Sequence, residues 1–165
     1  MTINFGDSST IASGSGRIIQ VLQTTRTDLF TTTSSSYSDY ISQAITPSST
    51  SSKIFCSFSA FEGSDGGDGN SYSQYKLMRG STHVYFGDAR GQAGRVSAGR
   101  FGRQQNYTSD HIGIDFLDSP STTSSVTYKI QVRSPRAGTF RVFLAGTARN
   151  DFFGGSSLPV SFTLM

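Results

Sequence analysis

Short runs of alternating apolar and polar residues, separated by Ser, Thr and Gly, extend through most of the chain. The clearest run is 53–61 (KIFCSFSAF), in which Ile54, Cys56, Phe58 and Ala60 fall on one face of an extended strand. Ser, Thr and Gly are poor residues for helix interiors, and no segment keeps the 3.6-residue period of an amphipathic helix. The pattern therefore predicts an all-β protein.

We expect a single module over residues 17–165, an antiparallel β-sandwich of jelly-roll type with about nine short strands. The chain has 165 residues, of which 35% are hydrophobic, with 13 Phe and 7 Tyr, so one substantial core is available. The first expected strand starts at Arg17 and is apolar on both faces. A hairpin is expected over 72–79 and 82–86, and later strands over 110–117, 126–132 and 158–165.

Residues 1–16 precede this module and end in the small residues SGSG. We interpret them as an N-terminal arm or anchor in which Ile3 and Phe5 contact a partner; a disordered tail is the alternative. This stretch has neither the basic nor the apolar region of a secretory signal. No window reaches the roughly 18 apolar residues of a membrane span. We therefore expect synthesis in the cytoplasm and no membrane insertion.

The most suggestive charged segment is the long connection 87–109, in which arginines alternate with glycines. Arg presents a rigid fork of donors to carboxylates and phosphates, and nearby rings can stack on a ligand. Three interpretations stay open: a solvated loop, a protein or inter-subunit contact, and binding to a polyanion or surface glycan. The candidate contact residues are Arg90, Arg95, Arg100, Phe101, Arg103 and Tyr107. The net charge of +3 is compatible with an anionic partner, but we expect no specific nucleic acid.

Metal and cofactor sites are not expected. Cys56 is the single cysteine and is predicted to be a buried structural residue. His83 and His111 alone are too few for a zinc site. Asp65 and Asp68 lie in a Gly-rich loop whose spacing does not fit an EF-hand, which leaves an irregular Ca²⁺ site as the alternative to a solvated turn.

An enzyme is not expected, because no nucleophile motif is present. A glycoside hydrolase would need two carboxylates across a cleft. The acidic candidates are Glu62, Asp88, Asp110, Asp115 and Asp118. A carbohydrate-binding module is the alternative from another functional class. Its candidate rings are Tyr72, Tyr75, Phe101 and Tyr107.

Several segments together resemble one family of structural proteins from marine bacteriophages, cyanophages among them. They are residues 18–28 (IIQVLQTTRTD), 45–54 (ITPSSTSSKI), 77–82 (LMRGST), 86–89 (FGDA), 116–121 (FLDSPS) with Tyr128-Lys129, and the ending 163–165 (TLM). The resemblance covers about residues 17–165. In that family the module occurs in tail-fibre-like and other virion proteins.

The resemblance implies a β-rich virion component that forms a homotrimer and contacts other virion proteins. It brings no catalytic residues and no cofactor. We expect a fibre-like or knob-like protein on the particle surface that takes part in host attachment, with a host glycan or receptor as its ligand. A capsid decoration protein is the alternative within the same class.

Overall fold

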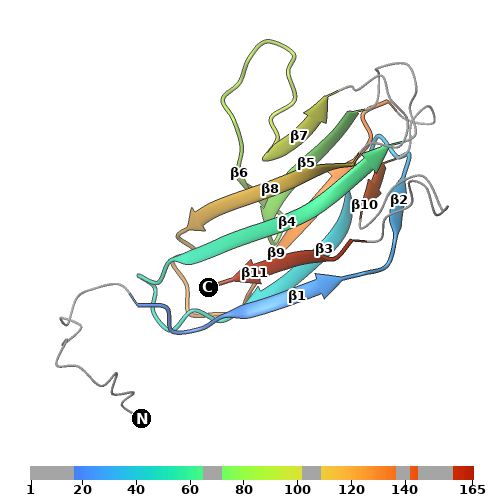
Figure 1. Cartoon of the computed structure of the whole chain (residues 1–165). Helices are drawn as coiled ribbons and strands as arrows, with labels where there is room; N and C mark the ends of the chain where they lie inside the picture. Colours follow the sequence, from blue (N-terminus) through green and yellow to red (C-terminus); the bar gives the residue numbers. More distant parts are fainter. Residues whose placement is uncertain (1–16, 65–71, 102–108, 137–141, 145–157) are drawn as a thin grey trace.

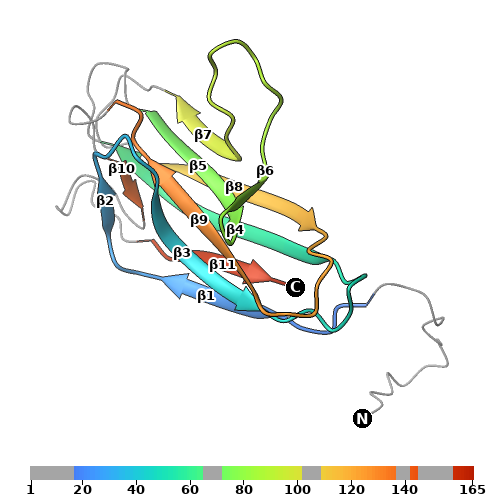
Figure 2. The same ribbon diagram turned by 180° about the vertical axis from the view of Figure 1, so that it is seen from behind.

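The computed structural model describes residues 17–64, 72–101, 109–136, 142–144 and 158–165. These residues form two antiparallel sheets that pack face to face (Figures 1 and 2). The expectation of an all-β sandwich is confirmed. The described residues hold eleven strands rather than about nine, because several strand positions are interrupted. No helix long and apolar enough to cross a membrane occurs in these ranges.

The strands divide between the sheets as follows. Sheet A contains β1 (Leu22–Arg26), β2 (Phe30–Thr32), β4 (Ile54–Ser64), β8 (Ser109–Asp118), β10 (Val142–Leu144) and β11 (Val160–Leu164). Sheet B contains β3 (Ser38–Ile45), β5 (Tyr72–Arg79), β6 (Thr82–Tyr85), β7 (Ala98–Phe101) and β9 (Val126–Arg133). Figure 1 shows sheet A in front, and Figure 2 shows sheet B in front.

The strand pairing has the nested order of a jelly roll. Strands β10 and β11 pair with the same side of β4, and β6 and β7 with the same side of β5, so each pair occupies one strand position. Strands β1 and β2 likewise share the edge beyond them. The β1/β2 position therefore pairs with the β10/β11 position. Inside this pair, β3 pairs with β9, β4 with β8, and β5 with the β6/β7 position. This is a long hairpin rolled into two sheets.

The core lies between the sheets and follows the predicted alternation. In β4 the side chains of Ile54, Cys56, Phe58 and Ala60 are all buried, as the sequence predicts. Sheet B contributes buried residues from β5 and β9, and β11 completes the core with Val160, Phe162 and Leu164. Phe58 packs edge-on against the Phe162 ring, with centroids 6.5 Å apart. Burial of these large apolar side chains is the main stabilising contribution.

Two local expectations differ from the structure. The first strand begins at Leu22, and Ile18, Ile19 and Val21 lie before it with exposed side chains. The long connection 87–109 is interrupted by β7, which pairs with the N-terminal half of β5. Both differences arise from tertiary pairing, which overrides local strand propensity.

The two ends of the sandwich differ in which chain segments they carry. Met165 exchanges two backbone hydrogen bonds with Phe55, at 2.9 and 3.0 Å, next to the start of β4. Residues 17–21, 46–53 and 119–125 belong to the same end, which we call the terminus-bearing end (Figure 1). The opposite end, where β4 finishes and β5 starts, is called the far end.

Candidate interaction surfaces

The structure separates the arginines of the 87–109 connection. Arg90 and Arg95 are exposed, whereas Arg100 lies in β7 and is only 6% exposed. Arg100 therefore differs from the surface contact residue that the sequence suggested. Phe101 ends β7, and nothing is described of its side chain. Arg103, Tyr107, Ile3, Phe5, Asp65 and Asp68 lie outside the described residues.

Arg100 joins a buried polar group at the far end, which we call the Glu62 clamp. Glu62 of sheet A is 1% exposed and accepts hydrogen bonds from the hydroxyls of Ser73 and Tyr75, both from β5 of sheet B. Arg100 Nη1 lies 3.6 Å from Glu62 Oε1, and Arg100 Nε donates to Asp110 Oδ2 at 2.6 Å. The cluster links the two sheets across the core.

Burial dominates the electrostatics of the Glu62 clamp. Desolvation raises the pKa of Glu62 above its ordinary value, against the opposing effects of the Ser73 and Tyr75 hydroxyls and of Arg100. Burial, together with the nearby Glu62 carboxylate, also raises the pKa of Tyr75. The register pairs Glu62 with Asp110, so two of the candidate acids are brought together and share one arginine. Their arrangement ties β4, β5, β7 and β8 together.

A second clamp joins the sheets at the terminus-bearing end. Asp118 of β8 accepts hydrogen bonds from the Tyr128 hydroxyl at 2.6 Å and from Arg79 Nη1 at 2.8 Å. Tyr128 is fully buried, but Arg79 keeps 30% of its side-chain exposure. Burial, and after it the hydrogen bond to Asp118, raises the pKa of Tyr128. We call this group the Asp118 clamp.

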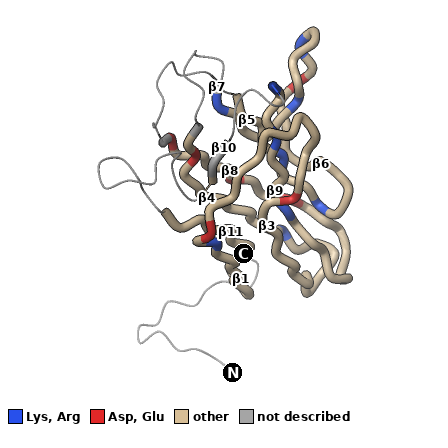
Figure 3. Tube along the Cα trace, turned by 90° about the vertical axis from the view of Figure 1, so that its right-hand side faces the viewer, with Lys and Arg blue, Asp and Glu red and all other residues tan. Residues whose placement is uncertain are grey.

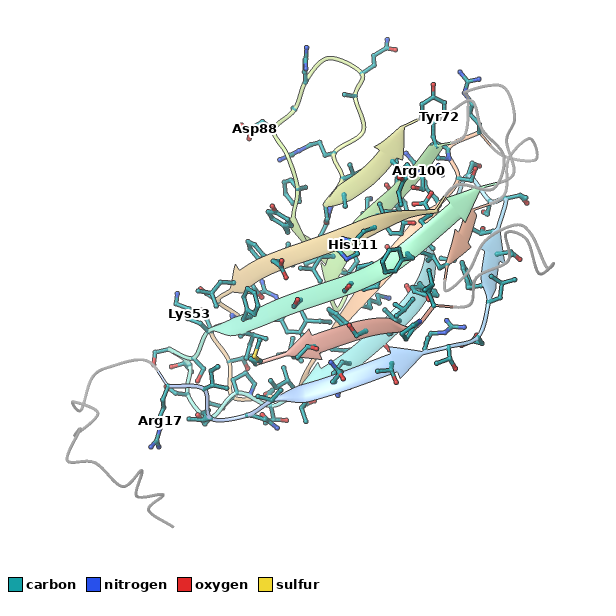
Figure 4. All side chains as sticks on the ribbon, viewed as in Figure 1. Arg17, Lys53, Tyr72, Asp88, Arg100 and His111 are labelled. Carbon is teal, nitrogen blue, oxygen red and sulfur yellow. The ribbon has the colours of Figure 1, made fainter. Side chains whose placement is uncertain are left out.

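The terminus-bearing end also carries an apolar cavity of about 720 Å³. Four large apolar side chains are more than half exposed here or beside it: Ile18 at 67%, Ile19 at 58%, Val21 at 57% and Leu117 at 57%. The cavity lining includes Ile18, Ile19, Phe55, Leu117 and Met165, with Arg17 and Lys53 also lining it. Figure 4 shows Arg17 and Lys53 at this end, with Tyr72 and Arg100 at the opposite one.

The outer face of sheet B holds a second distinctive surface. Lys76 Nζ lies 4.3 Å from the centroid of the Tyr37 ring, and the Arg133 guanidinium lies 4.6 Å from the same ring. Arg133 also donates twice to Gln74 Oε1, at 2.8 and 2.6 Å. Two cations are thereby held beside one aromatic ring on the outward positions of β5 and β9.

The connection 86–97 adds a third cation to this surface. The Arg95 guanidinium stacks on Phe86, 4.1 Å from the ring centroid, and Phe86 packs against His83 at 4.6 Å. A β-carbon on Gly94 would lie 3.4 Å from Gln74 Nε2 and 3.7 Å from Arg133 Nη2. The connection thus returns across the outer face of sheet B. We call the surface formed by Tyr37, Lys76, Phe86, Arg95 and Arg133 the basic face (Figure 3).

The outer face of sheet A is different in character. Ser57 and Ser59 point outward from β4, Ser161 and Thr163 point outward from β11, and His111 lies beside them on β8 (Figure 4). Ser59 Oγ and His111 Nε2 are 2.9 Å apart, and His111 packs against the Phe61 ring at 5.4 Å. His83 belongs to the other sheet. In the described ranges no group of three or more His, Cys, Asp or Glu is placed to hold a metal ion.

The remaining sequence candidates fall in separate places. Tyr75 is fully buried, so its ring is closed to a ligand. Tyr72 is half-buried, and the Arg136 guanidinium lies 5.1 Å from the centroid of its ring. Asp88 is exposed in the 86–97 connection, and Asp115 is exposed on β8 of sheet A. Sequence reasoning named Arg95 as a candidate contact but missed the other residues of the basic face on sheet B. A signal was available, since Gln74 and Lys76 occupy the outward positions of a predicted strand.

Comparisons with known proteins identify no family for this chain. No model of a known protein family matches it, and no curated protein matches it either.

Proposed function

We propose that this chain is a non-enzymatic structural protein of a bacteriophage particle, carried on the particle surface and held there through its terminus-bearing end. Two lines support the proposal. One is the resemblance of residues 17–165 to structural proteins of marine bacteriophages. The other, and the observation that carries it, is the apolar surface around Ile18, Ile19 and Leu117.

Apolar side chains that surround a cavity on a protein surface are typical of an interaction site. Burying one exposed isoleucine contributes about 1.5–3 kcal/mol, so a few such residues can hold an assembly together. We propose copies of the same chain as the first partner, in a closed ring that buries this end of every subunit. The far end and the basic face then point away from the contact.

Within this class we favour a fibre-like or knob-like attachment protein over a capsid decoration protein. Attachment needs an exposed surface that recognises the host. The basic face on sheet B is such a surface, and none of its five residues lines the cavity at the terminus-bearing end.

Cryo-electron microscopy of the intact particle tests the proposal by locating the chain and counting its copies. A few copies at the tail or at one vertex, with residues 17–21 against a neighbour, are expected. Hundreds of copies at regular shell positions would replace the attachment role with decoration. Absence of the chain from purified particles would overturn the proposal.

A further inference from the structure

We propose that the basic face binds acidic polysaccharides, whose carboxylate or sulfate groups are held by Lys76, Arg95 and Arg133. The inference names a ligand class for the attachment role and in that respect rests on the proposed function. Its physical basis is separate, because it depends on the outer surface of sheet B alone.

The first argument is that the three cations of the basic face are not ion-paired with a described carboxylate. Four cations of the described chain, Arg26, Arg79, Arg100 and Lys129, each form an ion pair with a carboxylate. Among the residues that the structure describes, no carboxylate lies within ion-pair distance of Lys76, Arg95 or Arg133. A cation already paired with a carboxylate is largely neutralised, whereas these three keep their charge for an anion from outside.

The second argument is that these cations are held in place. Tyr37 contacts both Lys76 and Arg133, Gln74 accepts two hydrogen bonds from Arg133, and Phe86 lies beneath Arg95. Arg95 Nε also donates to the Gly87 carbonyl at 2.9 Å. Stacking on a ring fixes a cation without neutralising it. Less side-chain entropy is then lost when a ligand binds, which favours affinity.

The charges of Lys76 and Arg95 both act on His83. Burial is the first cause that lowers the pKa of His83, and the positive charges of Lys76 and Arg95 lower it further. Both cations therefore act on one point of the surface. Asp39 is the acid on the neighbouring strand, and it already accepts hydrogen bonds from Lys129 and Gln131, each at 2.7 Å.

An acidic saccharide fits this face better than a nucleic acid does. Nonspecific binding of single strands relies on aromatic rings with free faces on which bases stack. Here Tyr37 already contacts two cations and Phe86 one. The surrounding outward positions carry side chains that suit sugar hydroxyls, namely Ser42, Gln74, Thr127 and Gln131.

The test is a binding titration of the full chain at about 150 mM salt, where the Debye length is about 8 Å. Fluorescent dextran sulfate and alginate are the sulfate and carboxylate probes, with neutral dextran and a single-stranded DNA oligonucleotide beside them. The test variant is Lys76→Gln with Arg95→Gln. The control is Arg26→Gln, compared with Arg95→Gln alone, because it removes one charge from β1, outside both the basic face and the cavity lining.

We expect at least one acidic polysaccharide to bind, neutral dextran not to bind, and the test variant to bind at least about tenfold more weakly. The control variant should stay within about twofold of the wild type. Asp39→Asn should tighten binding by about two- to threefold, because it frees Lys129. Arg95→Gln alone provides the comparison if the double variant folds poorly, since Arg95 is exposed.

Binding of neither acidic probe overturns the inference, as does equal weakening by the test and control variants. DNA binding tighter than that of both polysaccharides overturns it in favour of a nucleic-acid ligand. Light scattering on the same samples separates the two proposals. An assembled chain without polysaccharide binding refutes this inference alone, and a monomeric chain that binds refutes only the proposed assembly.

Discussion

The Glu62 clamp and the Asp118 clamp perform the same task at opposite ends of the sandwich. In each, an arginine and a tyrosine of sheet B meet a carboxylate of sheet A. The two clamps differ in how deeply their side chains are buried. Arg100 and Glu62 are 6% and 1% exposed, whereas Arg79 keeps 30% of its side-chain exposure. The clamp at the far end is enclosed within one chain, and the clamp at the terminus-bearing end is open to its surroundings.

The apolar surface follows the same division. Beside the open Asp118 clamp lie the cavity and the exposed side chains of Ile18, Ile19 and Leu117. The buried polar groups of the Glu62 clamp have partners within the chain. The exposed apolar side chains at the terminus-bearing end support our proposal that a neighbouring copy covers this end.

The largest expected effect comes from opening the two clamps in turn. Arg100→Ala leaves the buried Glu62 carboxylate without its cation, so we expect a loss of about 3 kcal/mol in the free energy of unfolding. Arg79→Ala should cost only about 1 kcal/mol, because water reaches that clamp. Urea denaturation at pH 7 measures both values. Equal losses of unfolding free energy in the two variants would contradict the conclusion that the Glu62 clamp is more deeply buried than the Asp118 clamp.

A smaller but selective effect is expected from charging the apolar surface. Ile19→Asp should weaken self-association by at least about tenfold, because an isoleucine that is buried in the contact is replaced by a carboxylate. Leu29→Asp is the matched control, since Leu29 is 55% exposed and does not line the cavity. Sedimentation over a dilution series measures the association constants. If both variants weaken association equally, the contact does not lie at the terminus-bearing end.

The pH dependence of stability examines the Glu62 clamp further. Burial raises the pKa of Glu62 in the folded state, so the folded chain retains this proton to higher pH than the unfolded chain does. The contribution of Glu62 to stability is therefore present below the unfolded pKa of about 4.3 and is lost as pH rises through the folded pKa.

The Glu62→Gln variant has no group that can ionise at this position, so it should not show this loss of stability as pH rises. The unfolding free energy of the variant relative to wild type should therefore rise as pH increases above about 4.3. Parallel stability profiles for the two proteins, measured by urea denaturation at a series of pH values, would show that the clamp holds an ordinary carboxylate.

The smallest perturbation is chemical labelling of Cys56, which lies near the Asp118 clamp. The side chain is fully buried, and burial, with a contribution from Asp118, raises the pKa of its thiol to about 12. Iodoacetamide at pH 8 should modify it at least about a hundredfold more slowly in the folded chain than in urea. Rapid labelling under native conditions would mean that this end opens readily by itself.

The alternating runs made much of the fold predictable. Residues 72–79 were expected as a strand and form β5 with those bounds, and the four inward positions of 53–61 are buried in β4. The burial of Arg100 was not predictable, because it depends on Glu62 and Asp110, which reach it only through strand pairing. The apolar run that starts at Ile18 was expected to form a strand, because a local pattern cannot distinguish a core strand from an exposed apolar segment.

The molar mass of the wild-type chain in solution tests the central claim most directly. Light scattering over a range of micromolar concentrations should give a multiple of the 17.7 kDa chain mass, which falls to a single chain in Ile19→Asp. A mass of one chain at every concentration would contradict the account, because the apolar surface of the terminus-bearing end would then remain uncovered by its own copies.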